Sequence, residues 1–230
     1  MTGHDRLAAV PAPPANLHSI SSDQINDLPL RHYAGPISIV STAQDVAAAA
    51  LYLRDETLLG FDTESRPAFR VGEQHPVSLL QLAGEEHVFL FQLQRITDLA
   101  PLFAILESER IRKVGVAFQH DVTQLQRLHP FTPRAFAEIG DLSRGLGVRN
   151  TGLRTLCAMF LGFRVAKGAK TTNWANHALT DAQVVYAATD AWVSRKLYVE
   201  MASGARPLHG APELPGDDDA DPSVDDRSRV

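Results

Sequence analysis

The stretch "GFDTES" (Gly60–Ser65) follows a short apolar run and contains two acids, Asp62 and Glu64. Side chains of an extended strand alternate between its faces, so residues two apart point to the same side. Both carboxylates therefore share one face of the predicted strand. Like charges in a partly buried place repel and shift each other's pKa, and a bound divalent cation is the commonest physical remedy. The pair predicts a metal site whose other ligands come from elsewhere in the chain.

The composition is that of an ordinary globular protein. The chain has 230 residues, of which 44% are hydrophobic and 21% charged, enough for one sizeable domain. No apolar run approaches the length of a membrane span, and prolines interrupt the N-terminal stretch where a signal peptide needs a continuous apolar segment. We expect a cytoplasmic protein with no membrane association. The single cysteine, Cys157, is expected to be a packing residue.

Two low-complexity ends flank the predicted domain. Residues 1–30 are rich in Pro, Ala and Ser, and residues 205–230 are acidic and rich in Pro and Gly, so both are predicted to be disordered tails around a domain at residues 31–204. Apolar periodicity predicts strands at 36–40, 57–64, 76–84, 86–93 and 111–118, and helices at 41–56, 98–109, 119–129, 152–162 and 180–201. A short strand or the start of a helix is expected within 136–147. This order indicates an α/β fold, with a mixed sheet surrounded by helices.

The net charge of −5 is unevenly distributed. Residues 205–230 hold seven acids and three arginines, which leaves 19 basic and 20 acidic residues of the chain's 22 and 27 for the rest. Between Asp141 and Asp181 there is no acid. Six basic residues fall in that interval: Arg144, Arg149, Arg154, Arg164, Lys167 and Lys170. The interval suits phosphate contacts, or it is the solvated face of a helix with a basic loop.

Two further acids stand in unusual surroundings. Asp190 lies among alanines and a tryptophan on the last predicted helix, one turn after Tyr186, so the two side chains share a helical face. Asp121 lies shortly after a predicted strand, near the start of the helix that follows it. Each acid by itself has an ordinary explanation, as a solvent-facing charge or as a favourable charge at a helix start.

Together, these motifs resemble those of the DEDD superfamily of 3′–5′ exonucleases. The motifs are "FDTE", "KVGVAFQHD" and "YAATD", and the tyrosine of the third marks the DEDDy branch, to which ribonuclease D and the exonuclease domain of the Werner syndrome helicase belong. The Asn-Trp of "TTNWANHALTDAQ" before the last motif is a fourth similarity. The resemblance extends from about Pro36 to Tyr198 and implies a ribonuclease H-like fold.

The resemblance also implies a set of functional residues. Asp62, Glu64, Asp121 and Asp190 would bind two divalent cations, Mg²⁺ or Mn²⁺, and Tyr186 would hold the attacking water. Hard cations prefer such oxygen ligands, and a pair of them suits phosphodiester hydrolysis. The substrate would be DNA or RNA with a free 3′ end, bound through phosphates and base stacking.

Some features of the substrate site stay open. Lys170 and Trp174 are candidates for backbone and base contacts, although Trp174 is equally suited to packing. Arg66 and Pro67 follow the first motif where relatives often have aromatic or aliphatic residues, so contacts to the terminal base are not predicted.

Two functions follow from these observations. The first is a metal-dependent 3′–5′ exonuclease that releases nucleoside 5′-monophosphates. The alternative is a catalytically weak nucleic-acid-binding or adaptor module on the same fold, which contacts a protein partner through the acidic tail. The complete set of four acids and a tyrosine favours the exonuclease.

Overall fold

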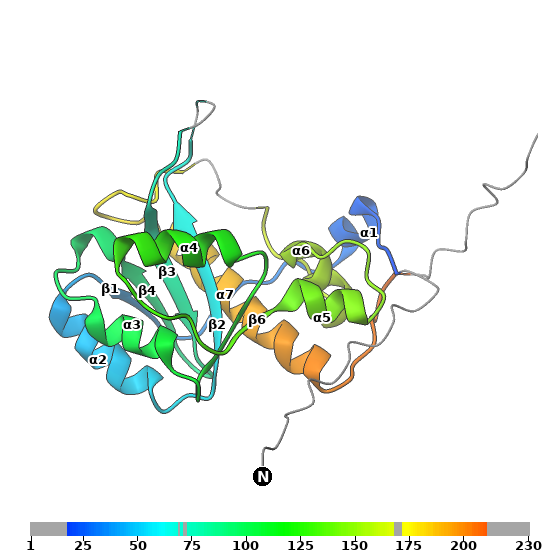
Figure 1. Ribbon diagram of the computed structural model, residues 1–230. Coiled ribbons are helices and arrows are strands. Elements are labelled where there is room, and N and C mark those ends of the chain that lie inside the picture. Colours follow the sequence, from blue (N-terminus) through cyan, green and yellow to red (C-terminus); the bar gives the residue numbers. More distant parts are fainter. Residues whose placement is uncertain (1–17, 69, 71–72, 168–171, 211–230) are drawn as a thin grey trace, which may run out of the picture.

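The computed structural model describes residues 18–68, 70, 73–167 and 172–210. A six-stranded mixed sheet in the order β1-β4-β3-β2-β5-β6 forms its centre. The strand β3 pairs antiparallel with both of its neighbours, β2 and β4, while β1 runs parallel to β4, β2 to β5 and β5 to β6. The strands are β1 (Ile37–Val40), β2 (Leu58–Ser65), β3 (Val77–Ala83), β4 (Val88–Gln92), β5 (Arg112–Gly115) and β6 (Phe136–Glu138). The predicted α/β class with a mixed sheet is confirmed (Figure 1).

Helices cover both faces of this sheet (Figure 1). They are α1 (Ser22–Asp27), α2 (Ala43–Leu53), α3 (Ala100–Glu107), α4 (Gln119–Leu128), α5 (Ile139–Gly145), α6 (Leu153–Leu156) and α7 (Asp181–Ala202), with the single turns η1 (Leu93–Arg95) and η2 (Cys157–Leu161). Successive residues of β3 serve opposite layers: Leu80 and Leu82 pack with α2, α3 and α4, whereas Leu79 and Ala83 pack with α7. The sheet is therefore buried between two helical layers, as its nearly uniform apolar strands require.

Two helix starts agree with the sequence patterns. Thr42 caps α2 and Thr180 caps α7, and each threonine accepts a hydrogen bond from the backbone of the third helical residue, Asp45 or Gln183. The side chains of Asp45 and Gln183 reach back to the cap residues, which completes two capping boxes. The caps fix the first residue of each helix. The Thr180 cap thereby fixes where Tyr186 and Asp190 of α7 lie along the sheet.

The predicted N-terminal tail is too long. Residues 18–30 contain α1, which begins with a capping box at Ser21 and buries Ile25 to 5% exposure. Isolated bridges join His18 to Val148 and Leu30 to Arg164. α1 thus lies beside α6 and away from the strands (Figure 1). The short helix has a single buried apolar side chain, so its sequence carries almost no periodic signal.

The C-terminal boundary also differs from the prediction. Residues 205–210 remain in contact with the domain, since the backbone N–H groups of Leu208 and His209 donate to the Met159 carbonyl. The Gly210 carbonyl oxygen lies 3.2 Å from Nδ1 of His18, so the two ends of the described chain meet. The acidic part of the predicted tail lies outside the described residues.

The helix predicted over 152–162 consists of two consecutive segments. α6 continues directly into η2, a single π-helical turn, and the segment ends at Gly162 with φ of 68°. Glycine adopts this left-handed conformation without steric cost, which explains the end of the helix. Cys157 is fully buried in this segment and packs in the apolar cluster with α5 and the second half of α7, as expected.

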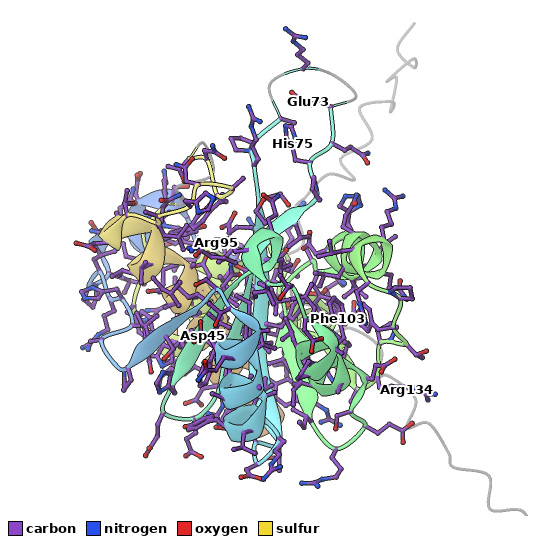
Figure 2. The ribbon with its side chains drawn as sticks, turned by 90° about the vertical axis from the view of Figure 1, so that its left-hand side faces the viewer. Asp45, Glu73, His75, Arg95, Phe103 and Arg134 are labelled. Carbon is purple, nitrogen blue, oxygen red and sulfur yellow. The ribbon has the colours of Figure 1, made fainter. Side chains whose placement is uncertain are left out.

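One loop extends from the body of the molecule. The described residues of the connection between β2 and β3 project beyond the end of the sheet, where Oε1 of Glu73 lies 3.1 Å from Nε2 of His75 (Figure 2). Among the residues described, no helix combines the length and apolarity needed to cross a bilayer.

Candidate active site

The acids Asp62 and Glu64 stand at the carboxyl end of β2, on the face that α7 covers. Gly60 precedes them on the same face, and a β-carbon there would lie 1.9 Å from the Ala191 carbonyl oxygen. Only glycine allows α7 to lie this close to β2. The close approach brings Asp190, the neighbour of Ala191, next to Asp62.

The helix α7 supplies Tyr186 and Asp190 from consecutive turns, as the i, i+4 spacing predicts. Asp190 is 6% exposed, whereas Tyr186 is half-buried. Burial raises the pKa of Tyr186, and the charge of Asp190 and a hydrogen bond between the two side chains raise it further. The phenol therefore keeps its proton at neutral pH.

The fourth acid, Asp121, comes from the first turn of α4. It lines a cleft of about 530 Å³ together with Asp62, Glu64, Tyr186 and Asp190. Burial raises the pKa of Asp121, while a hydrogen bond from the Thr63 hydroxyl and the nearby His120 oppose that rise. All five residues that the sequence predicts for the catalytic centre thus lie around one cleft.

The electrostatics of the cleft favour a bound cation. Ligand oxygens of Asp62, Glu64 and Asp190 lie within 4.8 Å of one another. Burial raises the pKa of Asp62 well above its usual range, and the charges of Asp190, Glu64 and Asp121 add to that rise. A divalent cation at this position would neutralise the carboxylates, and its hard character matches their oxygen ligands. The residues present therefore fit a divalent metal centre.

A second cleft, of about 480 Å³, adjoins the acidic one and shares Tyr186 and Asp190 with it. Arg154 and Lys167 line this cleft, and both come from the segment that contains no acids. The Arg154 guanidinium donates to the Val165 carbonyl and to Asn26. Positive side chains therefore begin directly beside the acidic centre.

The two predicted substrate contacts have different outcomes. Lys170 lies outside the described residues. Trp174 is 1% exposed and packs in the cluster beneath α7, with its ring centroid 6.0 Å from that of Tyr186. A buried ring offers no face to a base. The prediction that Trp174 stacks on a base is therefore wrong, and its alternative, a packing role, describes the residue. His120 is an exposed residue of α4.

Two residues beside the cleft were not singled out from the sequence. Thr63 lies between Asp62 and Glu64 and hydrogen-bonds Asp121. Glu138 accepts hydrogen bonds from the Ala117 N–H, with 2.9 Å to each carboxylate oxygen. Thr63 had a signal, since it stands inside the first motif. Glu138 had none, because an acid at the start of a helix is ordinary.

The fold and the site together define a class: an α/β domain with a cluster of carboxylates suited to divalent cations at the end of a central strand. A family model described as 3′-5′ exonuclease matches residues 37–204. The chain therefore belongs to the 3′-5′ exonuclease family.

Relatives with known names agree with this assignment. Ribonuclease D of Haemophilus influenzae is 31% identical over 164 residues, which cover 70% of this chain and 38% of that protein. The bifunctional 3′-5′ exonuclease/ATP-dependent helicase WRN of Mus musculus is 28% identical over 188 residues, or 77% of this chain and 13% of that protein. The chain thus spans well under half the length of these relatives.

A solved structure gives the same result for the fold. RNase D of Escherichia coli, described as an exoribonuclease involved in structured RNA processing, superposes with a TM-score of 0.65 at 26% identity. The match covers 73% of this chain and 45% of that one. The ribonuclease H-like fold implied by the sequence motifs is confirmed.

Proposed function

We propose that this protein hydrolyses nucleic acids from the 3′ end and releases nucleoside 5′-monophosphates. The observation that carries the proposal is the convergence of Asp62, Glu64, Asp121, Tyr186 and Asp190 on one cleft from three different elements. Membership of the 3′-5′ exonuclease family supports the same reaction.

The four carboxylates would hold two divalent cations, Mg²⁺ or Mn²⁺. When bound, such ions supply Lewis acidity and make a water nucleophilic at neutral pH. The close oxygens of Asp62, Glu64 and Asp190 form the densest part of this ligand set, and Asp121, which lines the same cleft, would complete it. Four carboxylates also balance the charge of two divalent ions, which makes their burial tolerable.

Tyr186 has the role of positioning the attacking water. Its raised pKa keeps the hydroxyl protonated, so it acts as a neutral hydrogen-bonding group and not as a phenolate. Asp190 fixes the direction of that hydroxyl through their hydrogen bond. The hydroxyl then helps to hold the water in line with the scissile phosphorus.

The substrate would lie along the boundary of the two clefts. Arg154 and Lys167 offer positive charge to the phosphates on the 5′ side of the reacting one. Backbone contacts of this kind read little sequence. RNA is the first polymer to test, because relatives of this chain carry the names ribonuclease D and RNase D.

A hydrolysis assay tests the proposal. Single-stranded RNA, single-stranded DNA and duplex DNA with a recessed 3′ end, each labelled at the 5′ end, would be incubated with Mg²⁺, Mn²⁺ or a chelator. We expect stepwise shortening that requires the metal and disappears in Asp62→Asn. The matched control is Asp55→Asn, since Asp55 is an exposed acid in a surface ion pair.

Two results would contradict the proposal. One is full activity of Asp62→Asn, which would separate hydrolysis from the acidic cleft. The other is a folded wild-type protein that binds these polymers and shortens none of them. The second result would favour the adaptor module, which a pull-down with and without residues 205–230 would then examine.

A further inference from the structure

The turn between β5 and α4 forms one wall of the acidic cleft. Its central residue, Ala117, has φ of 57°, although it is not a glycine. It lines the acidic cleft on one side and a smaller cleft of about 160 Å³ on the other. An L-residue in the left-handed region persists only where surrounding contacts hold it.

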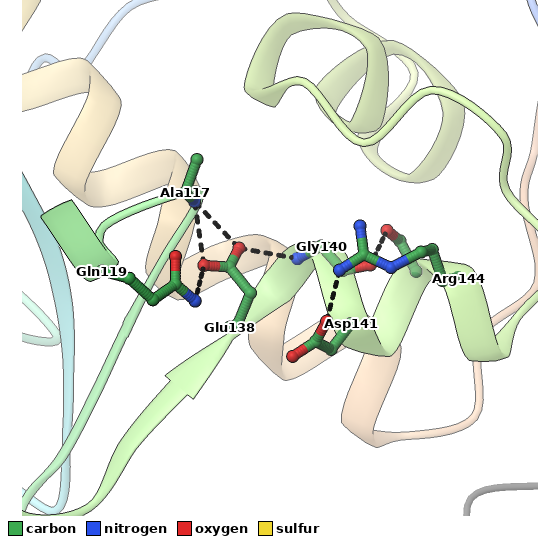
Figure 3. A network of polar contacts seen from close by, with 7 residues as sticks. Ala117, Gln119, Glu138, Gly140, Asp141 and Arg144 are labelled. Carbon is green, nitrogen blue, oxygen red and sulfur yellow. Dashed lines mark hydrogen bonds and ion pairs between the residues drawn. The ribbon is translucent and has the colours of Figure 1, made fainter.

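The contacts that hold this turn come from the carboxylate of Glu138, at the end of β6. Both of its oxygens lie 2.9 Å from the Ala117 nitrogen, and Oε2 also accepts from Nε2 of Gln119 at 3.0 Å (Figure 3). Oε1 accepts from the Gly140 N–H at 3.0 Å, at the start of α5 (Figure 3). One carboxylate therefore joins the turn, the first residue of α4 and the first turn of α5.

The start of α4 has no capping side chain of its own. Its N-cap residue, Phe118, makes no side-chain capping hydrogen bond, and Asp121 lies in the first helical turn. Charge-assisted hydrogen bonds from backbone N–H groups to a carboxylate are among the stronger polar contacts in proteins. Glu138 thus restrains the segment that carries Asp121 into the cleft.

The turn is also held close to β2. A β-carbon at Gly115 would lie 2.6 Å from the Phe61 carbonyl oxygen, and Phe61 directly precedes Asp62. The Thr63 hydroxyl bonds Asp121 across the same gap. A shift of the turn would therefore change the separation between Asp121 and the acids of β2.

We propose that Glu138 is a positioning residue for the metal centre, which holds Ala117 in its left-handed conformation and thereby places Asp121 against Asp62. This inference rests on the proposed function, because it takes Asp121 to be a metal ligand. A simple cap of α5 would need only the bond to Gly140. The bonds to Ala117 and Gln119 lead away from α5 and toward the cleft.

The test compares metal binding with folding in Glu138→Gln. The amide keeps the size of the side chain but replaces one acceptor oxygen with an NH₂ group that faces N–H donors. Mn²⁺ binding would be measured by electron paramagnetic resonance, without substrate. We expect the dissociation constant to rise about tenfold, as for other residues that orient metal ligands, and the Ala117 N–H to exchange faster with deuterium in the metal-free protein.

A second substitution tests the direction of the effect. Glycine adopts a positive φ without steric cost, so Ala117→Gly added to Glu138→Gln should recover most of the lost Mn²⁺ affinity. The matched control is Glu107→Gln, because the Glu107 carboxylate also accepts from a backbone N–H, that of Thr132 at 2.8 Å, but on another part of the surface. It should leave Mn²⁺ affinity unchanged.

The results separate this inference from the proposed function. Unchanged Mn²⁺ affinity in a folded Glu138→Gln protein overturns the positioning role, whatever its thermal stability. If that variant fails to fold, Gln119→Met removes one bond of the same carboxylate from an exposed side chain, and an unchanged affinity there has the same meaning. A wild type that binds Mn²⁺ with this dependence but hydrolyses nothing supports the inference and contradicts the proposed function; a wild type that binds no Mn²⁺ overturns both.

Discussion

Neighbouring strands β2 and β5 each place a charged side chain at least partly in the interior, and the two charges have opposite surroundings. Lys113 of β5 is fully buried, and its Nζ donates to the carbonyls of Ile105 and Ser108 at the end of α3, 5.2 Å from the Phe136 ring centroid. Asp62 of β2 instead lies beside other carboxylates, and burial together with their charges raises its pKa. Carbonyl oxygens at a helix C-terminus compensate a cation. The lysine is thus accommodated by the fold itself, whereas the repulsion among the acids of β2 and α7 would be relieved by a bound cation.

The largest expected effect is the loss of activity when one carboxylate of the acidic cleft is removed. Asp62→Asn and Asp190→Asn should each lower hydrolysis by about a thousandfold or more, since each removes a carboxylate that would hold the cations needed to stabilise the transition state. Neither should lower the melting temperature without metal, because removing one charge relieves repulsion among the remaining acids. Steady-state rates and thermal unfolding in a chelator would check both expectations.

Metal titration adds a control for this prediction. Mn²⁺ should raise the melting temperature of the wild type, because a ligand that binds only the folded state stabilises it. It should raise that of Asp62→Asn much less. A large loss of stability in either Asn variant without metal would mean that these acids, like Lys113, are accommodated by the fold itself.

Gly60→Ala should give the next largest effect, since it forces α7 away from β2. The added β-carbon would overlap the Ala191 carbonyl oxygen, so we expect a loss of about 3 kcal/mol in the free energy of unfolding, typical of overpacking. Activity should fall as well, because Asp190 moves with α7. Chemical denaturation would measure the loss. Gly145→Ala is the matched control, as a β-carbon there would meet nothing within 4 Å; equal losses in both variants would contradict the role of Gly60.

Lys113 predicts a dependence of stability on pH. Burial lowers its pKa from 10.5 to about 8. Between these two pH values the unfolded chain binds one proton more than the folded chain, so the free energy of unfolding rises with pH across that window. The lysine should contribute a rise of about 3 kcal/mol to the wild type, and Lys113→Met should lack it. Chemical denaturation at pH 7.5 to 10.5 would give the free energy of unfolding of both proteins, which should rise more with pH in the wild type. An equal dependence on pH in the two proteins would mean that the pKa of Lys113 is not lowered.

The smallest expected effect concerns the support of α7. Trp174→Phe should cost about 1 to 2 kcal/mol, because the smaller ring leaves a cavity beneath α7 and the indole Nε1 has no hydrogen-bond partner among the described residues. The Michaelis constant for nucleic acid should not change. A raised Michaelis constant with unaltered stability would restore Trp174 as a substrate contact.

The sequence by itself determined the parts of this protein that follow from local periodicity. The alternation of a strand placed Asp62 and Glu64 on one face, and the helical repeat stacked Tyr186 and Asp190. The capping boxes at Thr42 and Thr180 and the left-handed end at Gly162 were likewise predictable. Each of these features depends on residues within a few positions of one another.

Tertiary structure alone decided the features that join distant segments. The docking of α1 beside α6, the burial of Trp174 and Lys113, and the hold of Glu138 on Ala117 all depend on how the helices pack against the sheet. Ala117 and Glu138 are 21 residues apart, and nothing in either short segment specifies the other. Such contacts form only once the sheet has brought β5 and β6 together, because packing and not local repeat determines which side chains meet.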